Sequence, residues 1–311
     1  MKIKITKKIQ KNKLLLRTIT TLIILLFFIT SFFITGYLKM GGRIYGVIFY
    51  AILCSIGIYE FVSHSEVKKI FVFYYIILGL ILLFLPWHEY FYVMINQGST
   101  KYMFIEQLKH WWIYLIIIIG SAFPFLFLIQ KKDLKFITKN YLLNLFAVLT
   151  FPIFIKWLLI INTIPNEGVY ILLYIGLITA TTDTLGLFGG MLFGRKIFKR
   201  GFAPKLSPRK SWEGAIIAWF FAVFVVVFIG SFYINKLLFL EENQFLFFSI
   251  STIVLLPLAS IWGDLLFSKI KRTFHVKDFS QLIPGHGGLL DRFDSTFLVT
   301  YTFVFLIIFF N

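Results

Sequence analysis

Carboxylates, bases, two histidines and several glycines are concentrated between residues 264 and 294 of an otherwise apolar sequence. Asp291 and Asp294 are three positions apart, so on a helical turn both carboxylates face the same way. With Asp264 they make a predicted oxygen-rich site of the kind that Mg²⁺ prefers and usually shares with a substrate phosphate. These residue types therefore predict metal-assisted chemistry on phosphates.

Other residues of this stretch suit the same chemistry. Gly287 and Gly288 let backbone N–H groups approach a phosphate closely. His286 is a candidate donor to a phosphate or leaving group. Basic side chains are candidates to neutralise phosphate oxygens; they include Lys271, Arg272, Lys277 and Arg292.

Each feature alone has a plainer explanation. The glycines suit a tight turn before a helix, and the bases suit control of membrane topology. The paired aspartates suit a helix N-terminus, where the dipole favours negative charge. Their combination in one segment favours a phosphate site.

A second segment, from Gly189 to Gly214, also combines small residues with bases. Ser207, Lys210, Ser211 and Glu213 are its candidate substrate contacts. This signal is weak alone, because Ser-Pro is a common helix start and Glu213 suits the first turn of a helix.

Three charged residues fall within apolar runs. Asp183 lies deep in its run, where a charge is costly and is usually retained for function. Its carboxylate is predicted either to hydrogen-bond between helices or to take part in the chemistry. Glu60 and Lys156 lie nearer the ends of their runs, so we expect both to snorkel to the interface.

The composition indicates that these residues are positioned by membrane helices. The 311 residues are 59% hydrophobic and only 14% charged, and the apolar residues come in blocks of about 20, the length that crosses a bilayer. We predict an all-α polytopic membrane protein with about nine spans. They lie near 16–38, 44–63, 70–87, 111–129, 141–162, 168–190, 214–234, 245–263 and 295–310.

This organisation divides into two parts. Residues 1–140 would hold four spans, and 141–311 would form a catalytic region of five spans with cytoplasmic loops 191–213 and 264–294. The first span is too long for a signal peptide and lacks a cleavage site, so it is expected to remain uncleaved. Cys54 is the only cysteine, which excludes an internal disulfide and a cysteine-based zinc site.

The net charge is +17, and the basic residues that produce it are concentrated on one predicted side of the membrane. With the N-terminus in the cytoplasm, 25 of the 31 Lys and Arg residues fall in the tail and in alternate connections. This bias predicts a cytoplasmic N-terminus and an outside C-terminus. Because the bases are spread over five segments, they argue against nucleic-acid binding and suit an anionic leaflet.

The C-terminal part resembles the phosphatidate cytidylyltransferases, or CDP-diglyceride synthases. The resemblance rests on a long pattern and on the segment Ser207–Gly214. The pattern is filled by Ser268, Ile270, Lys271, Arg272, Lys277, Asp278, Ser280, Ile283, Pro284, His286, Gly287, Gly288, Leu289, Asp291, Arg292, Phe293 and Asp294. The sixth span departs from the family, with Gly186 and Leu187 where Ala-Tyr is frequent.

The resemblance implies that CTP and phosphatidic acid give CDP-diacylglycerol and diphosphate at the inner face of the plasma membrane. It implies Mg²⁺ held by Asp264, Asp291 and Asp294, with K⁺ as a candidate second cation. Ser268, Lys277 and Asp278 join the substrate contacts. Oligomeric state stays open, with a homodimer as one candidate. The competing hypotheses are a CTP-dependent lipid or polyprenol kinase and an ion-coupled transporter.

Overall fold

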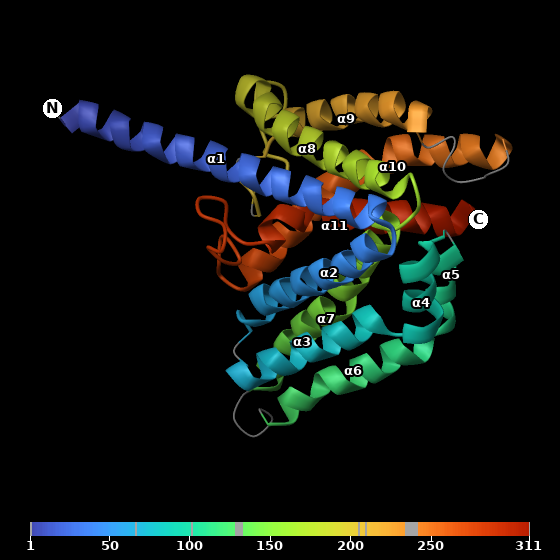
Figure 1. The fold of residues 1–311 in the computed structure, drawn as a ribbon. Coiled ribbons are helices and arrows are strands. Elements are labelled where there is room, and N and C mark those ends of the chain that lie inside the picture. The colour runs from blue at the N-terminus through green and yellow to red at the C-terminus, as the bar shows by residue number, and fades with distance from the viewer. Residues whose placement is uncertain are drawn as a thin grey trace.

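The computed structural model describes residues 2–310 except 66, 101, 128–132, 205, 209 and 234–241, and this described part is helical with no strand (Figure 1). Its helices are α1 (Lys2–Tyr37), α2 (Lys39–Val62), α3 (Lys69–Phe84), α4 (Trp87–Gln97), α5 (Tyr102–Lys109), α6 (Trp111–Leu126), α7 (Leu134–Asn162), α8 (Gly168–Phe193), α9 (Trp212–Tyr233), α10 (Glu242–Thr273) and α11 (Leu290–Phe310).

Each of the nine predicted spans coincides with one helix. In the described residues, six helices (α1, α2, α7, α8, α10 and α11) are long and apolar enough to cross a membrane. A seventh span results if α5 and α6, bent by 60° at their junction, count as one. An all-α, multi-pass membrane protein is therefore confirmed, whereas the count of nine stays a prediction. Helices α4 and α5 were not predicted.

The connections alternate between two ends of the bundle. The N-terminus, the α2–α3 connection, the start of α7 and the loops after α8 and α10 lie at one end (Figure 1). The α1–α2 and α7–α8 turns and the C-terminus lie at the other end. This alternation agrees with the distribution of basic residues; which end faces the cytoplasm stays a prediction. Six of the 31 basic residues lie outside the described residues: Lys101, Lys131, Lys132, Lys205, Arg209 and Lys236.

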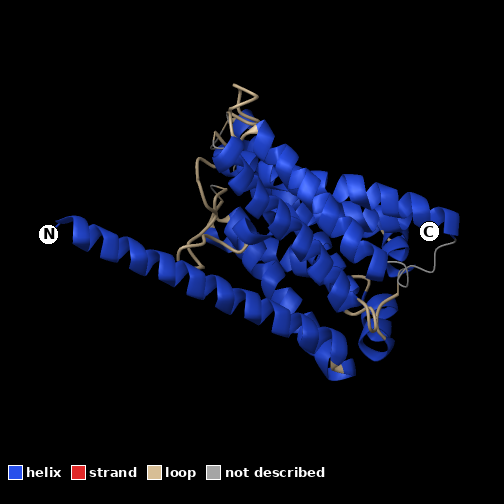
Figure 2. Cartoon of the chain, turned by 90° about the horizontal axis from the view of Figure 1, so that it is seen from above, coloured by secondary structure: helices blue, strands red, loops and turns tan. Residues whose placement is uncertain are grey.

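Helix α7 forms the centre of the bundle and α1 its periphery. Of the most apolar 18-residue stretch of each helix, 67% is buried inside the protein in α7 but only 11% in α1. The N-terminal half of α1 projects beyond the other helices (Figures 1 and 2). Helix α7 begins at Leu134, so the domain boundary predicted after residue 140 falls within its first turns.

The snorkelling prediction for Lys156 is wrong. Its side chain is buried, at 5% exposure, and its Nζ donates to the Leu85 carbonyl at 2.6 Å. Leu85 follows the last residue of α3, where carbonyls lack intrahelical partners, so the amine finds an acceptor inside the bundle.

Two helix crossings near the site depend on glycine. A Cβ at Gly214 of α9 would lie 2.7 Å from the Gly186 carbonyl oxygen of α8. A Cβ at Gly263 of α10 would lie 2.6 Å from the Asp294 carbonyl oxygen of α11. Small residues allow membrane helices to approach backbone to backbone. These crossings place α8 against α9 and α10 against α11.

Candidate active site

Three carboxylates from three helices form the centre of the site. Asp183 comes from α8, Asp264 from α10 and Asp294 from α11, and they lie close enough to repel one another electrostatically. We call them the carboxylate cluster. Ser295 Oγ donates to Asp183 Oδ1 at 3.0 Å, and Ser268 Oγ donates to Asp264 Oδ1 at 3.3 Å. The predicted hydrogen bond of Asp183 to another helix is thus present, whereas its part in the chemistry stays a prediction.

Two lysines reach these carboxylates from different segments. Lys210, in the connection before α9, forms an ion pair with Asp264. Lys271 Nζ lies 2.9 Å from Asp291 Oδ1 and 3.6 Å from Asp294 Oδ2. Because one amine contacts both aspartates, the prediction that Asp291 and Asp294 face the same way is confirmed.

Asp291 folds the α10–α11 connection onto the start of α11. Its Oδ2 accepts hydrogen bonds from the backbone N–H groups of Phe279 and Gly288, each at 2.9 Å. Gly287 has φ +85°, and a Cβ there would lie 2.8 Å from Asp291 Oδ2. The glycines therefore let the backbone approach a carboxylate, and the N–H of Gly288 is already engaged.

Glu60 of α2 holds the same connection from the other side. Its carboxylate accepts hydrogen bonds from Ser280 Oγ at 2.6 Å and from the N–H groups of Leu289 and Leu290 at 2.9 Å. Glu60 is only 2% exposed, so the snorkelling prediction is wrong. The start of α11 presents N–H groups without intrahelical acceptors, and these favour a carboxylate.

The site residues lie on helices more than on loops. The segment predicted as a loop over 264–294 is a loop only between α10, which ends at Thr273, and α11, which begins at Leu290. Asp264, Ser268 and Lys271 therefore lie on α10. Basic residues in its last turn and an acid in the first turn of α11 agree with both helix dipoles.

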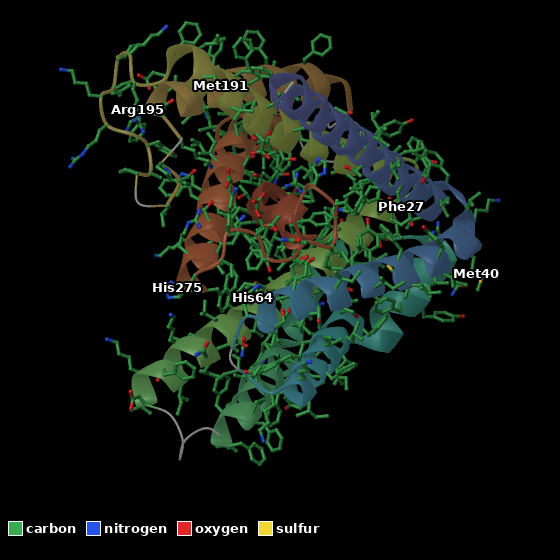
Figure 3. The ribbon with its side chains drawn as sticks, turned by 90° about the vertical axis from the view of Figure 1, so that its left-hand side faces the viewer. Phe27, Met40, His64, Met191, Arg195 and His275 are labelled. Carbon is green, nitrogen blue, oxygen red and sulfur yellow. The ribbon has the colours of Figure 1, made fainter. Side chains whose placement is uncertain are left out.

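A cavity of about 690 Å³ opens beside the carboxylate cluster, and we call it the α8–α9 cavity. Its walls come from α8, α9, α10 and the connection between α8 and α9. Its polar lining comprises Thr182, Asp183, Arg195, Ser207, Lys210, Ser211 and Asp264. Figure 3 looks onto this end, with Arg195 on one side of the bundle and His64 of the α2–α3 connection on another. Leu187, which stands where the family frequently has Tyr, lines the cavity, and its side chain is exposed.

Ser211 and Glu213 shape the α8–α9 connection. Ser211 Oγ accepts from the Gly214 N–H at 3.1 Å and caps α9. Glu213 Oε1 accepts from the N–H groups of Ile197 and Phe198 at 2.9 Å. Burial acts to raise the pKa of Glu213, but these backbone hydrogen bonds outweigh it and lower the pKa to about 2. The alternative prediction of a first-turn acid is confirmed for Glu213, whereas the helix begins at Trp212 and not directly after Ser207-Pro208.

The structure does not bring every predicted residue to the cluster. Lys277 and Asp278 are exposed on the α10–α11 connection, and Arg272 donates to the Val276 carbonyl at 3.2 Å. His286 instead contacts α1, with its ring nitrogens 3.1 Å from Thr20 Oγ1 and 2.8 Å from Thr21 Oγ1.

Asp264, Asp294 and Asp291 differ in how free their carboxylates are to bind a cation. Asp264 lines the cavity and Asp294 stands beside it in the cluster, whereas Asp291 accepts three hydrogen bonds from within the protein. As the described side chains stand, no group of three or more His, Cys, Asp or Glu is arranged to hold a metal ion. The predicted three-aspartate ligand set therefore stays a prediction.

Sequence comparison places the chain in a class. It matches the cytidylyltransferase family over residues 15–310 and belongs to that family. It is 32% identical over 253 residues to the phosphatidate cytidylyltransferase of Haemophilus influenzae, covering 77% of this chain and 82% of the relative. The enzyme of the same name from Rickettsia conorii is 39% identical over 160 residues, covering 50% of this chain and 65% of the relative. That from Staphylococcus aureus is 37% identical over 134 residues, covering 43% and 47%. The suspected family is thus confirmed.

Reasoning from the sequence did not identify Glu60 or Ser295 as site residues. Glu60 is an acid within an apolar run, which is a signal, but its partners are more than 200 positions away. Ser295 directly follows Asp294 and gives no chemical signal of its own.

Proposed function

We propose that this chain transfers the cytidylyl group of CTP to phosphatidic acid, giving CDP-diacylglycerol and diphosphate. The observation that carries the proposal is the carboxylate cluster, which stands with Lys210 and Lys271 beside the α8–α9 cavity. The relatives described above carry this activity in their names.

The reaction needs charge control more than a strong base. Phosphate monoesters have a second pKa of about 6, so the lipid phosphate is largely a dianion at neutral pH. One of its oxygens attacks the α-phosphorus of CTP, and the bond from that phosphorus to the β-phosphate oxygen breaks. No proton has to be removed from the nucleophile. The obstacle is repulsion between two polyanions, which positioned cations reduce.

Lys210 and Lys271 neutralise negative charge at different places in the site. Lys210 lines the α8–α9 cavity, so it is placed to neutralise the triphosphate of CTP. Lys271 lies deeper, between Asp291 and Asp294, and holds the carboxylates on the side of the α10–α11 connection. Ser207 at the cavity wall supplies a hydroxyl for the nucleotide.

Asp264 and Asp294, with Asp183 beside them, are the residues proposed to hold Mg²⁺. Their mutual repulsion in a partly buried site favours a cation. When bound, Mg²⁺ supplies positive charge that draws phosphate oxygens together. Asp291 acts chiefly by ordering the α10–α11 connection, with Oδ1 as its remaining contact to the site. K⁺ remains a candidate second cation.

Location follows from the substrates. CTP is cytosolic and the phosphatidic-acid headgroup lies at the interface, so the site end of the bundle is proposed to face the cytoplasm at the plasma membrane. The basic residues at that end suit an anionic leaflet. The competing hypotheses, a lipid kinase and a transporter, are not favoured, because the relatives are named as cytidylyltransferases.

Labelled CTP tests the proposal. Membranes holding the chain are incubated with phosphatidic acid and CTP labelled at either the α- or the γ-phosphate, with Asp264→Asn as the inactive control. Transfer of α-label to lipid supports cytidylyl transfer. Transfer of γ-label would indicate a kinase, and no transfer would exclude both reactions.

A further inference from the structure

A second hollow, the α1–α8 groove, lies away from the α8–α9 cavity. It has a volume of about 260 Å³ and is bounded by α1, α7, α8 and α11. Phe28 and Phe32 of α1 and Leu172 and Ile175 of α8 line its apolar part. Gly176 leaves room there, because a Cβ at that position would meet nothing within 4 Å.

The groove has one polar end, and it is the end nearest the active site. Thr21 of α1, His286 and Arg292 line it together, and Thr296, one turn of α11 further on, is the other polar residue in the described lining. On each wall the apolar residues lie deeper in the bundle, from Thr21 to Phe32 along α1 and toward Leu172 along α8. The described lining residues include no acid. This polarity matches a phospholipid, whose headgroup lies at the interface and whose chains run inward.

Arg292 is available to an anion. Its side chain is exposed and makes no hydrogen bond or ion pair within the described part of the chain. An arginine offers planar paired donors that match phosphate oxygens. His286 stands at the same end, anchored to Thr21 at 2.8 Å.

The groove also leads to the reacting groups. Arg292 is close enough to interact electrostatically with Asp183 of the carboxylate cluster. Gly176 precedes Asp183 by two turns of α8, a rise of roughly 10 Å, so a chain beside Gly176 lies inward of a phosphate at Arg292. Thr182 and Asp183 line the α8–α9 cavity, whereas Leu172 and Gly176 line the groove.

We propose that the α1–α8 groove holds the phosphatidic-acid substrate, with its phosphate on Arg292 and His286 and an acyl chain beside Gly176. CTP then occupies the α8–α9 cavity, and the two substrates meet at the carboxylate cluster from different sides of α8. This inference rests on the proposed function for the identity of the lipid.

Photo-crosslinking tests the placement independently of turnover. The full chain in phosphatidylcholine vesicles is irradiated with phosphatidic acid that carries a diazirine in one acyl chain, and labelled peptides are mapped. We expect label on α1 between Thr21 and Phe32 and on α8 around Gly176. Filling the groove by Gly176→Phe should lower labelling by about tenfold, the equivalent of losing burial of about two methylenes. Gly41→Phe, at another helical glycine with open space, should leave it unchanged.

Separate arms identify the recognised group. Arg292→Ala should reduce labelling by phosphatidic acid but not by diazirine-bearing phosphatidylcholine, and inorganic phosphate should not compete. Label confined to α8 near Leu187, equal labelling by both lipids, or unchanged labelling in Gly176→Phe would each overturn the placement. If α-labelled CTP gives no labelled lipid while the groove is still labelled selectively, the proposed function fails and the lipid site stands.

Discussion

Replacing Glu60 is expected to disable the site from a helix that carries none of the carboxylate cluster. In Glu60→Ala, the N–H groups of Leu289 and Leu290 lose their acceptor while they remain buried. A buried donor without a partner costs about 1–3 kcal/mol, so the two together cost roughly 2–6 kcal/mol. The lower value corresponds to about 30-fold in the equilibrium between the ordered and displaced α10–α11 connection.

A graded series makes this prediction specific. Glu60→Gln keeps the side-chain volume and one carbonyl oxygen, so it should lose one of the two backbone hydrogen bonds and fall between wild type and Glu60→Ala. Glu167→Ala is the matched control, since Glu167 makes no side-chain capping bond at the start of α8. Activity is measured as α-label transferred to lipid, with thermal unfolding to verify that each variant is folded.

Limited proteolysis reports the loop directly. Lys277 is exposed in the α10–α11 connection, and trypsin cuts after lysine in mobile segments. Cleavage after Lys277 should accelerate in Glu60→Ala and less in Glu60→Gln. If Glu60→Ala keeps activity within twofold of wild type and its cleavage rate is unchanged, the assignment of Glu60 as a positioning residue is wrong.

Four other perturbations address the cluster and the helix crossings. Asp264→Asn should lower the rate by about 100-fold or more, and Mg²⁺ removal by chelation should abolish turnover of wild type; activity without divalent metal contradicts the proposed cation site. Asp291→Asn should keep the fold but accelerate proteolysis of the α10–α11 connection, because Asn presents one acceptor oxygen; unchanged proteolysis argues against a loop-ordering role. Gly214→Ala, with its Cβ 2.7 Å from the Gly186 carbonyl oxygen, should cost about 1–3 kcal/mol of stability, whereas Gly41→Ala meets open space; equal melting temperatures refute the close crossing.

The sequence predicts best those features that depend on short spacings. Apolar runs of span length predict the helices, and the three-residue spacing predicts that Asp291 and Asp294 share a face. The helix ends are less predictable, because polar residues such as Asp264 and Lys271 resemble a loop although they continue α10 by several turns. Helices α4 and α5 are short and carry mixed residues, so no membrane-length pattern indicates them.

Contacts between distant segments are the part that sequence reasoning missed. Glu60 and Lys156 sit near the ends of apolar runs, where snorkelling is the ordinary outcome. Both instead find backbone groups at the ends of other helices, Glu60 at α11 and Lys156 at α3. Predicting such contacts requires knowing which helix ends lie next to each other in the fold. The residues around Glu60 and Lys156 in the sequence do not indicate this.

The glycine crossings restrict how the α8–α9 cavity changes shape. At Gly214 and Gly263 the backbones of α8 and α9, and of α10 and α11, approach so closely that a Cβ would clash with a carbonyl oxygen. Each pair is therefore packed backbone to backbone at that point, with no side chain between the two helices. The two pairs meet through side chains instead, where the hydroxyls of Thr182 of α8 and Ser260 of α10 are hydrogen-bonded, so we expect a change in the width of the cavity to alter this contact before the glycine crossings.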